Sequence, residues 1–160
     1  MLGNDRKMFY SYDSGWEHTF FDERTGGFVV TELARKYKPM SRNESDIFLK
    51  EQRMAMKYAS FGFQIEHLNE CPGISSPDVN VIRCLNGMNK KGMTADFKQL
   101  SSANNIYQEG KDAMNKKRAD LVMFEFTEHF NGLDRKLEKL VAKEIHGFYY
   151  YSNENSFYSF

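Results

Sequence analysis

The chain has 160 residues, a length typical of one domain, and its 22 basic side chains balance 22 acidic ones. A formal net charge of zero excludes long-range attraction of the whole molecule to nucleic acid, although a local basic face could still contact phosphates. The two cysteines do not form a close-spaced zinc ligand pair, and no run of residues has the length and apolar character of a membrane span.

The first forty residues are predicted to form a leader and a β-hairpin appendage. Residues 1–13 carry no regular apolar pattern, so we expect an irregular leader there. Two short strands are predicted at residues 16–21 and 28–33, because Gly, Thr and Asp residues of the kind that form turns separate them. We expect residues 41–160 to form a separate α/β domain.

The rest of the chain alternates helical and strand patterns. Ser41 or Asn43 is expected to cap the first long helix. The predicted elements are a helix at 44–60, a strand at 63–68, a hairpin between residues 76 and 100, a helix at 102–117, a strand at 121–126, a helix at 132–145 and a hairpin at 148–160. This order predicts an α/β (or α+β) three-layer domain with helices flanking a mixed β-sheet.

Acidic and basic residues recur in the hairpin between residues 76 and 100. Asp78 opens its first strand, and Asp96 and Lys98 lie in its second strand. Residues i and i+2 of a strand share a face, so Asp96 and Lys98 should project together while Phe97 points the other way. If the strands pair in register, Asp78 joins them on that face. Two carboxylates and an ammonium group in this arrangement are typical of metal-dependent phosphodiester hydrolysis.

These residues resemble a known signature. Pro77-Asp78 followed by Asp96-Phe97-Lys98 resembles the PD-(D/E)XK motif of the restriction-endonuclease-like nuclease superfamily. The region from Glu44 to Phe126 is similar to C-terminal tRNA-nuclease domains of contact-dependent inhibition toxins and to related phage and mobile-element domains of Bacteroidales. The segments that carry this likeness are residues 51–55, 74–78, 101–106 and 119–126.

The resemblance implies an endonuclease that uses Mg²⁺ or Mn²⁺. Asp78, Asp96 and the backbone carbonyl of Phe97 would bind the metal, with Glu51 from the preceding helix as a further ligand and catalytic residue. Hard carboxylate oxygens suit these ions. Lys98 would orient or deprotonate the attacking water, or stabilise charge in the transition state. The superfamily at large suggests DNA as the substrate, and the toxin domains suggest RNA such as tRNA.

Several polar residues around the motif are candidates for nucleic-acid contacts. Between Arg83 and Arg118 there are eight basic residues and three acidic ones. The candidates for phosphate contacts are Lys90, Lys91, Gln99, Ser102, Gln108 and Lys111.

Two other functions stay open on the sequence alone. The domain could be a module that binds nucleic acid or protein without cleaving, with the aromatic C-terminal residues as a surface for base stacking. It could instead be a metal-independent ribonuclease that uses His67, or His146 with Tyr149 and Tyr151.

The sequence also leads to expectations about partners and location. The resemblance to toxins implies an inhibitory immunity-type protein as a partner. The C-terminal hairpin could pair edge to edge in a homodimer. Because the N-terminus lacks an apolar signal region, we expect a cytoplasmic protein, and the resemblance implies a bacterial or phage origin.

Overall fold

The computed structural model describes residues 2–70, 73–83 and 93–160. They form two compact units, the first comprising residues 2–70, 78–83 and 93, and the second comprising residues 73–77 and 94–160. Each unit combines a mixed group of strands with helices, so the predicted α/β class is confirmed. Among the described residues, no helix combines the length and the apolar character needed to cross a membrane.

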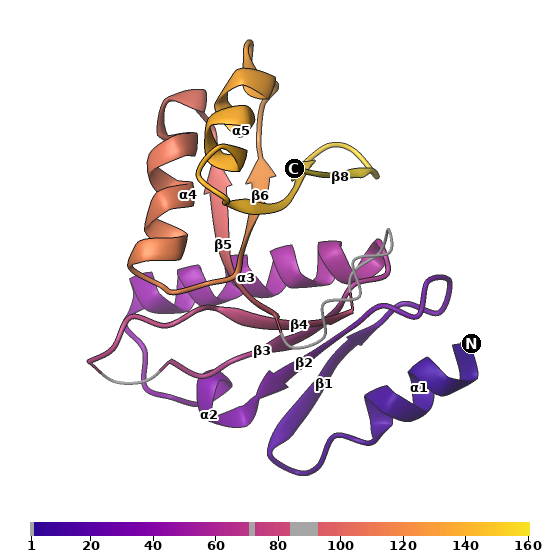
Figure 1. Ribbon diagram of the computed structural model, residues 1–160. Helices are drawn as coiled ribbons and strands as arrows, with labels where there is room; N and C mark the ends of the chain where they lie inside the picture. The colour runs from indigo at the N-terminus through magenta and orange to yellow at the C-terminus, as the bar shows by residue number, and fades with distance from the viewer. Residues whose placement is uncertain (1, 71–72, 84–92) are drawn as a thin grey trace. The chain divides into compact units, whose positions relative to one another are not determined.

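The first unit contains four strands in the order β1-β2-β3-β4 (Figure 1). β2 pairs antiparallel with β1 and parallel with β3, and β3 pairs antiparallel with β4. The elements are α1 (Leu2–Tyr10), β1 (Trp16–Phe21), β2 (Phe28–Glu32), α2 (Leu33–Lys36), α3 (Arg42–Ser60), β3 (Gln64–His67) and β4 (Val79–Arg83).

Helices cover both faces of this sheet. On one face, Phe9 of α1 packs against Phe28 and Val30 of β2. The other face carries α3, which connects the parallel strands β2 and β3 and whose Gln52 is hydrogen-bonded to Thr31 of β2 (Figure 1). The first unit is therefore three layers deep, and one of its layers is α1, which the sequence did not predict.

The N-terminal segment differs from the irregular leader that the sequence predicts. Residues 2–10 form α1, because burial of Phe9 against β2 stabilises a helix whose own apolar pattern is weak. The β-hairpin is confirmed, and its turn lies against the end of α3, where a Cβ on Gly27 would come within 1.8 Å of the Ala59 carbonyl oxygen. The division between residues 1–40 and 41–160 stays a prediction.

Apart from one short 3-10 helix, the second unit follows a β-α-β-α-β-β order. β5 pairs parallel with β6, β6 pairs parallel with β7, and β8 pairs antiparallel with β7. Its elements are β5 (Met93–Leu100), the 3-10 helix η1 (Ala103–Asn105), α4 (Ile106–Asn115), β6 (Leu121–Phe126), α5 (Leu133–Val141), β7 (His146–Tyr151) and β8 (Phe157–Ser159).

An apolar core lies between these strands and the helices α4 and α5. Val122, Phe124 and Phe126 alternate along β6 and face Leu137 and Leu140 of α5. The alternate residues of β6 are also buried, so every position of this strand is inside the protein. This explains why residues 121–126 read as an uninterrupted apolar run, which is typical of a central parallel strand.

Candidate functional site

Asp96 and Lys98 project from the same face of β5, as the sequence predicts. Lys98 Nζ lies 3.0 Å from Asp96 Oδ2, and Asp96 is only 1% exposed. Lys98 pairs in register with Phe124, which places both on the face that carries α4 and α5. Phe97 is buried on the opposite face. This face of β5 therefore carries a carboxylate and an ammonium group next to each other.

Glu109 of α4 completes this cluster and was not predicted. Its Oε2 lies 3.4 Å from Lys98 Nζ, so two carboxylates converge on one ammonium group. The sequence suggested a polar residue on this helix at Gln108 or Lys111. Gln108 instead donates a hydrogen bond to Asp112, and the Lys111 ammonium lies 5.3 Å from the Tyr107 ring. We call Asp96, Lys98 and Glu109 the β5–α4 cluster.

The cluster keeps Lys98 charged. Burial by itself lowers the pKa of Lys98, but the negative charges of Asp96 and Glu109 outweigh it, and the pKa is raised above its ordinary value. Lys98 is therefore protonated at neutral pH. A protonated lysine can donate a hydrogen bond or stabilise an anion, whereas it cannot accept a proton from water.

The donor set of the cluster suits a hard cation. Carboxylate oxygens from β5 and α4 already surround a positive charge, and such oxygens are the ligands that Mg²⁺ and Mn²⁺ prefer. In the described part of the chain, no group of three His, Cys, Asp or Glu side chains is arranged to hold a metal. A bound ion would therefore need to take the place of the Lys98 ammonium beside Asp96.

Gln99 lies on the opposite face from the cluster. It donates a hydrogen bond to Glu125 Oε1, and Tyr150 donates to Glu125 Oε2, so a short polar ladder crosses β5, β6 and β7. Glu125 is buried and both of its oxygens are satisfied. Ser102, another predicted nucleic-acid contact, caps η1 by accepting a hydrogen bond from the Asn104 backbone N–H. Lys90 and Lys91 lie outside the described residues.

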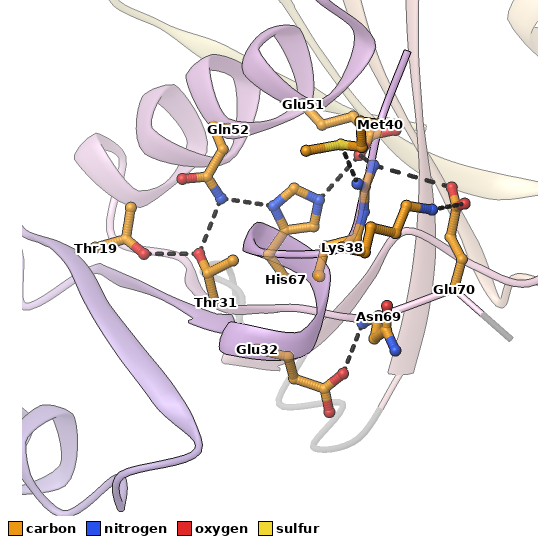
Figure 2. Close-up of polar contacts among 11 residues, drawn as sticks. Thr19, Thr31, Glu32, Lys38, Met40, Glu51, Gln52, His67, Asn69 and Glu70 are labelled. Atoms are coloured by element: carbon orange, nitrogen blue, oxygen red, sulfur yellow. Dashed lines mark hydrogen bonds and ion pairs between the residues drawn. The ribbon is translucent and has the colours of Figure 1, made fainter. Parts of the chain in front are cut away.

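Glu51 belongs to a buried polar network in the first unit (Figure 2). Glu51 Oε2 accepts from Arg35 Nη2 at 3.3 Å and contacts His67 Nε2 at 2.9 Å. Arg35 is 3% exposed and His67 is fully buried, so this charge pair is sealed from water. The guanidinium of Arg35 lies 4.8 Å from the Phe48 ring, which in turn stacks on His67.

The same network continues to β1 and β2. Figure 2 shows the Gln52 amide between Thr31 and His67. Its Nε2 donates to Thr31 Oγ1 at 2.9 Å and lies 2.6 Å from His67 Nδ1. An amide nitrogen can only donate, so His67 Nδ1 accepts and its Nε2–H donates to Glu51. We call Arg35, Glu51, Gln52, Thr31 and His67 the α3 network.

The other carboxylate of the motif, Asp78, belongs to the first unit. Asp78 directly precedes β4, is buried, and accepts a hydrogen bond at its backbone carbonyl from the Leu68 N–H at 3.0 Å. The predicted sharing of one metal ion by Asp78, Glu51 and Asp96 stays a prediction.

The histidines give less support to a ribonuclease without metal. His67 is fully buried and held on both ring nitrogens, so a substrate cannot reach it. His129 stacks on Tyr151 with ring centroids 3.9 Å apart and contacts Glu154. Tyr149 stacks on Tyr158 of the C-terminal hairpin.

Comparison with known proteins identifies a similar fold. No family model matches the chain, and no curated protein matches it in sequence. A chain of the CdiA-CT/CdiI toxin and immunity complex from Burkholderia pseudomallei is similar in structure, with a TM-score of 0.55 and 12% sequence identity. The match covers 77% of this chain and 91% of that chain. At this identity, the similarity extends to the fold alone.

Proposed function

We propose that this protein is a toxin-like endonuclease that hydrolyses phosphodiester bonds with the help of a divalent metal ion. The observation that carries the proposal is the β5–α4 cluster, in which Asp96 and Lys98 of the motif that resembles PD-(D/E)XK meet Glu109 of α4. The fold shared with a chain of a toxin and immunity complex supports the same class.

Each residue of the cluster has a distinct role in this proposal. Asp96 and Glu109 would hold the metal ion, which supplies a polarised water and offsets the charge of the phosphate. Lys98, which the ion would replace beside Asp96, would then be free to stabilise negative charge on the phosphate oxygens. The sequence predicts that Asp78, Glu51 and the Phe97 carbonyl contribute to the same site, and we keep those residues in the proposal.

The test is a nuclease panel of tRNA, single-stranded RNA and DNA, and duplex DNA, with Mg²⁺, with Mn²⁺ and with EDTA. We expect Asp96→Asn and Lys98→Met each to lower the cleavage rate by roughly 100-fold or more, because they remove groups that act on the reacting phosphate. Glu138→Gln, which changes an exposed carboxylate of α5, is the matched control and should cleave normally.

Metal binding needs its own measurement. Calorimetric titration with Mn²⁺ should give a binding isotherm for the wild type that is lost in Asp96→Asn, while the thermal midpoint of unfolding shows whether the variant is folded. Full cleavage activity in EDTA would refute the metal-dependent proposal. An effect of Asp78→Ala on Mn²⁺ binding would show that Asp78 also serves the metal.

The second candidate is a module that binds a protein partner without cleaving nucleic acid. The specific observation in its favour is that Asp96 and Glu51 are already paired with Lys98 and Arg35. Because the similar chain comes from a toxin and immunity complex, an immunity-type partner is proposed in either case. This function would be favoured if no nucleic acid of the panel is cleaved and the Asp96→Asn variant still binds the partner.

A further inference from the structure

A groove lined with lysines lies between α5 and the η1–α4 segment of the second unit. Its volume is about 540 Å³. Lys136, Lys139 and Lys143 line one side. Asn104 and Tyr107 line the other side, and Ala142 contributes a small side chain that leaves the groove open. None of these residues belongs to the β5–α4 cluster or to the predicted nucleic-acid contacts.

The three lysines form a row that the fold fixes in place. Their spacing of three and four residues sets them on one side of α5 and its C-terminal turn. Leu133, Leu137 and Leu140 of the same helix are buried in the core, so the lysine row cannot turn away from the groove. From Lys136 to Lys143 the row extends roughly 10 Å along the helix axis. Lysines spaced in this way can contact successive negative charges along a chain, whereas they do not enclose a single anion.

The positive charge of this row is not balanced locally. Within the residues that the structure describes, Lys136, Lys139 and Lys143 take part in no ion pair with a carboxylate. The acids of the same helix, Asp134 and Glu138, line a different surface hollow together with Tyr149 and Phe160. The charges of α5 are therefore sorted into a basic side and an acidic side.

The opposite wall of the groove, formed by Asn104 and Tyr107, carries an amide and an aromatic ring, which are groups that can contact nucleic-acid bases. Tyr107 lines the groove and is half-buried against the core, and the Lys111 ammonium lies 5.3 Å from its ring. Asn104 is exposed beside it and carries an amide that can both donate and accept hydrogen bonds. An aromatic ring and an amide facing a row of lysines match the chemistry of unpaired nucleotides.

We propose that this groove binds single-stranded nucleic acid, with the phosphates along the lysine row and a base stacked on Tyr107. The inference rests on the proposed nuclease function, for which it provides a substrate-binding surface separate from the reacting groups. A protein ligand with acidic side chains would satisfy the lysines but would leave the aromatic wall without a partner. For this reason we favour the nucleic acid.

The test is a binding titration in EDTA, which prevents cleavage. Labelled oligouridylate and oligothymidylate are titrated with the full-length wild type and with the triple variant Lys136→Gln, Lys139→Gln, Lys143→Gln, and binding is followed by fluorescence anisotropy. We expect the triple variant to bind at least roughly tenfold more weakly and the slope of log K against log salt to fall by about 2, since each phosphate contact to a single strand contributes about 0.7.

The matched control changes the same charge elsewhere in the second unit. Arg118, Arg135 and Lys116 are exposed and do not line the groove, so their triple replacement by Gln should leave binding within about twofold. Tyr107→Leu should weaken binding roughly fivefold or more, whereas Tyr107→Phe keeps the ring and should bind like the wild type. Thermal unfolding of each variant identifies any loss of binding that arises from misfolding.

Several outcomes would overturn the proposal. These are no oligonucleotide binding by a folded wild type, equal binding by the triple lysine variant, or an equal loss in the control triple. Polyglutamate that binds as tightly as the oligonucleotides, with the same dependence on the lysines and none on Tyr107, would show that the groove recognises an acidic protein instead.

The experiment separates this inference from the proposed function. Asp96→Asn should bind the oligonucleotides normally and fail to cleave them. Binding that depends on the lysines, in a protein that never cleaves, would refute the nuclease function and leave the groove in place. Cleavage that is unaffected by the lysine variant, at substrate concentrations below saturation, would refute the groove and leave the nuclease function in place.

Discussion

The α3 network and the β5–α4 cluster both pair a buried carboxylate with a cation, yet they differ in their access to solvent. In the α3 network, Arg35 and His67 are sealed and Glu51 is nearly so. In the β5–α4 cluster, Asp96 is equally buried, but the side chains of Lys98 and Glu109 are 22% and 32% exposed. The α3 network as it stands is closed to a ligand, whereas the β5–α4 cluster can meet one from solvent.

In this protein, access of the partner cation to solvent separates structural acids from functional ones. A buried ion pair gains little net stability over an apolar replacement, but loss of one partner leaves an uncompensated charge. Burial and pairing alone therefore do not mark a catalytic residue. The useful signal is a buried acid whose partner cation reaches solvent, as Lys98 does beside Asp96. On this criterion, Asp96 is a stronger candidate than Glu51.

The largest expected effect comes from breaking the α3 network. Glu51→Ala removes the acceptor of the His67 N–H and the nearer of the two carboxylates that pair with Arg35, the other being that of Glu70 at 3.9 Å. We expect the free energy of unfolding to fall by about 3–5 kcal/mol. Equilibrium denaturation in urea measures the change. Asp46→Ala removes an exposed carboxylate from the same helix and should alter stability by about 0.5 kcal/mol or less.

A double variant sharpens this prediction. Arg35→Met combined with Glu51→Met removes both charges at once, so its loss of stability should be smaller than the sum of the two single losses. If Glu51→Ala were as stable as the wild type but had no cleavage activity, the contrast between the two regions would not hold. That result would make Glu51 a functional acid, as the resemblance to PD-(D/E)XK nucleases implies.

Local pattern was sufficient to predict most of the strands and helices. Alternation set Asp96 and Lys98 on one face of β5, and the spacing of Leu133, Leu137 and Leu140 identified α5. Of the two caps that the sequence allowed for α3, the structure has Ser41, whose Oγ accepts a hydrogen bond from the Glu44 N–H. These features depend on residues within a few positions of each other, which is the range that sequence patterns report.

Features that depend on distant residues were missed. Glu51 lies 16 residues from both Arg35 and His67, and nothing in the sequence indicates that the three side chains meet. The helix α1 depends on the contact of Phe9 with Phe28. Glu109 was missed for another reason: η1 takes up residues 103–105, so α4 begins at Ile106 rather than at 102 and presents a different side chain.

A smaller effect is expected from Tyr150→Phe in the second unit. The variant removes the hydroxyl that donates to Glu125 Oε2 and leaves that buried oxygen without this donor. We expect a loss of about 1–3 kcal/mol in the free energy of unfolding. Tyr149→Phe is the matched control on the same strand and should change stability by about 0.5 kcal/mol or less. Urea denaturation of both variants tests whether a sealed acid in the second unit behaves like Glu51.

If Tyr150→Phe and Tyr149→Phe lose equal stability, Glu125 is solvated or finds another donor. The distinction between sealed and reachable acids would then not apply to the second unit. A clear difference between the two variants would extend the comparison, since the paired strands β5 and β6 would carry a sealed acid on one face and a reachable cluster on the other.

The smallest expected effect on stability is that of Lys98→Met, and it should depend on pH. In the folded protein, burial lowers the pKa of Lys98, but the charges of Asp96 and Glu109 raise it by more, so the pKa lies above its ordinary value. The stability that Lys98 contributes is therefore fully present below the unfolded pKa, near 10.4, and is lost as the pH rises through the higher folded value. At pH 8 we expect the variant to be less stable by about 1 kcal/mol or less, because the pair is partly exposed to solvent.

Urea denaturation of the wild type and Lys98→Met at about pH 8 and about pH 11 measures this difference, since the two pH values lie on either side of the unfolded pKa of lysine. The gap in stability should narrow at the higher pH, where Lys98 begins to lose its proton in both states. An unchanged gap would mean that the side chain acts through packing and not through its charge. Because the same variant should abolish cleavage at pH 8, a small loss of stability with a large loss of activity would identify the β5–α4 cluster as functional, in contrast with the α3 network.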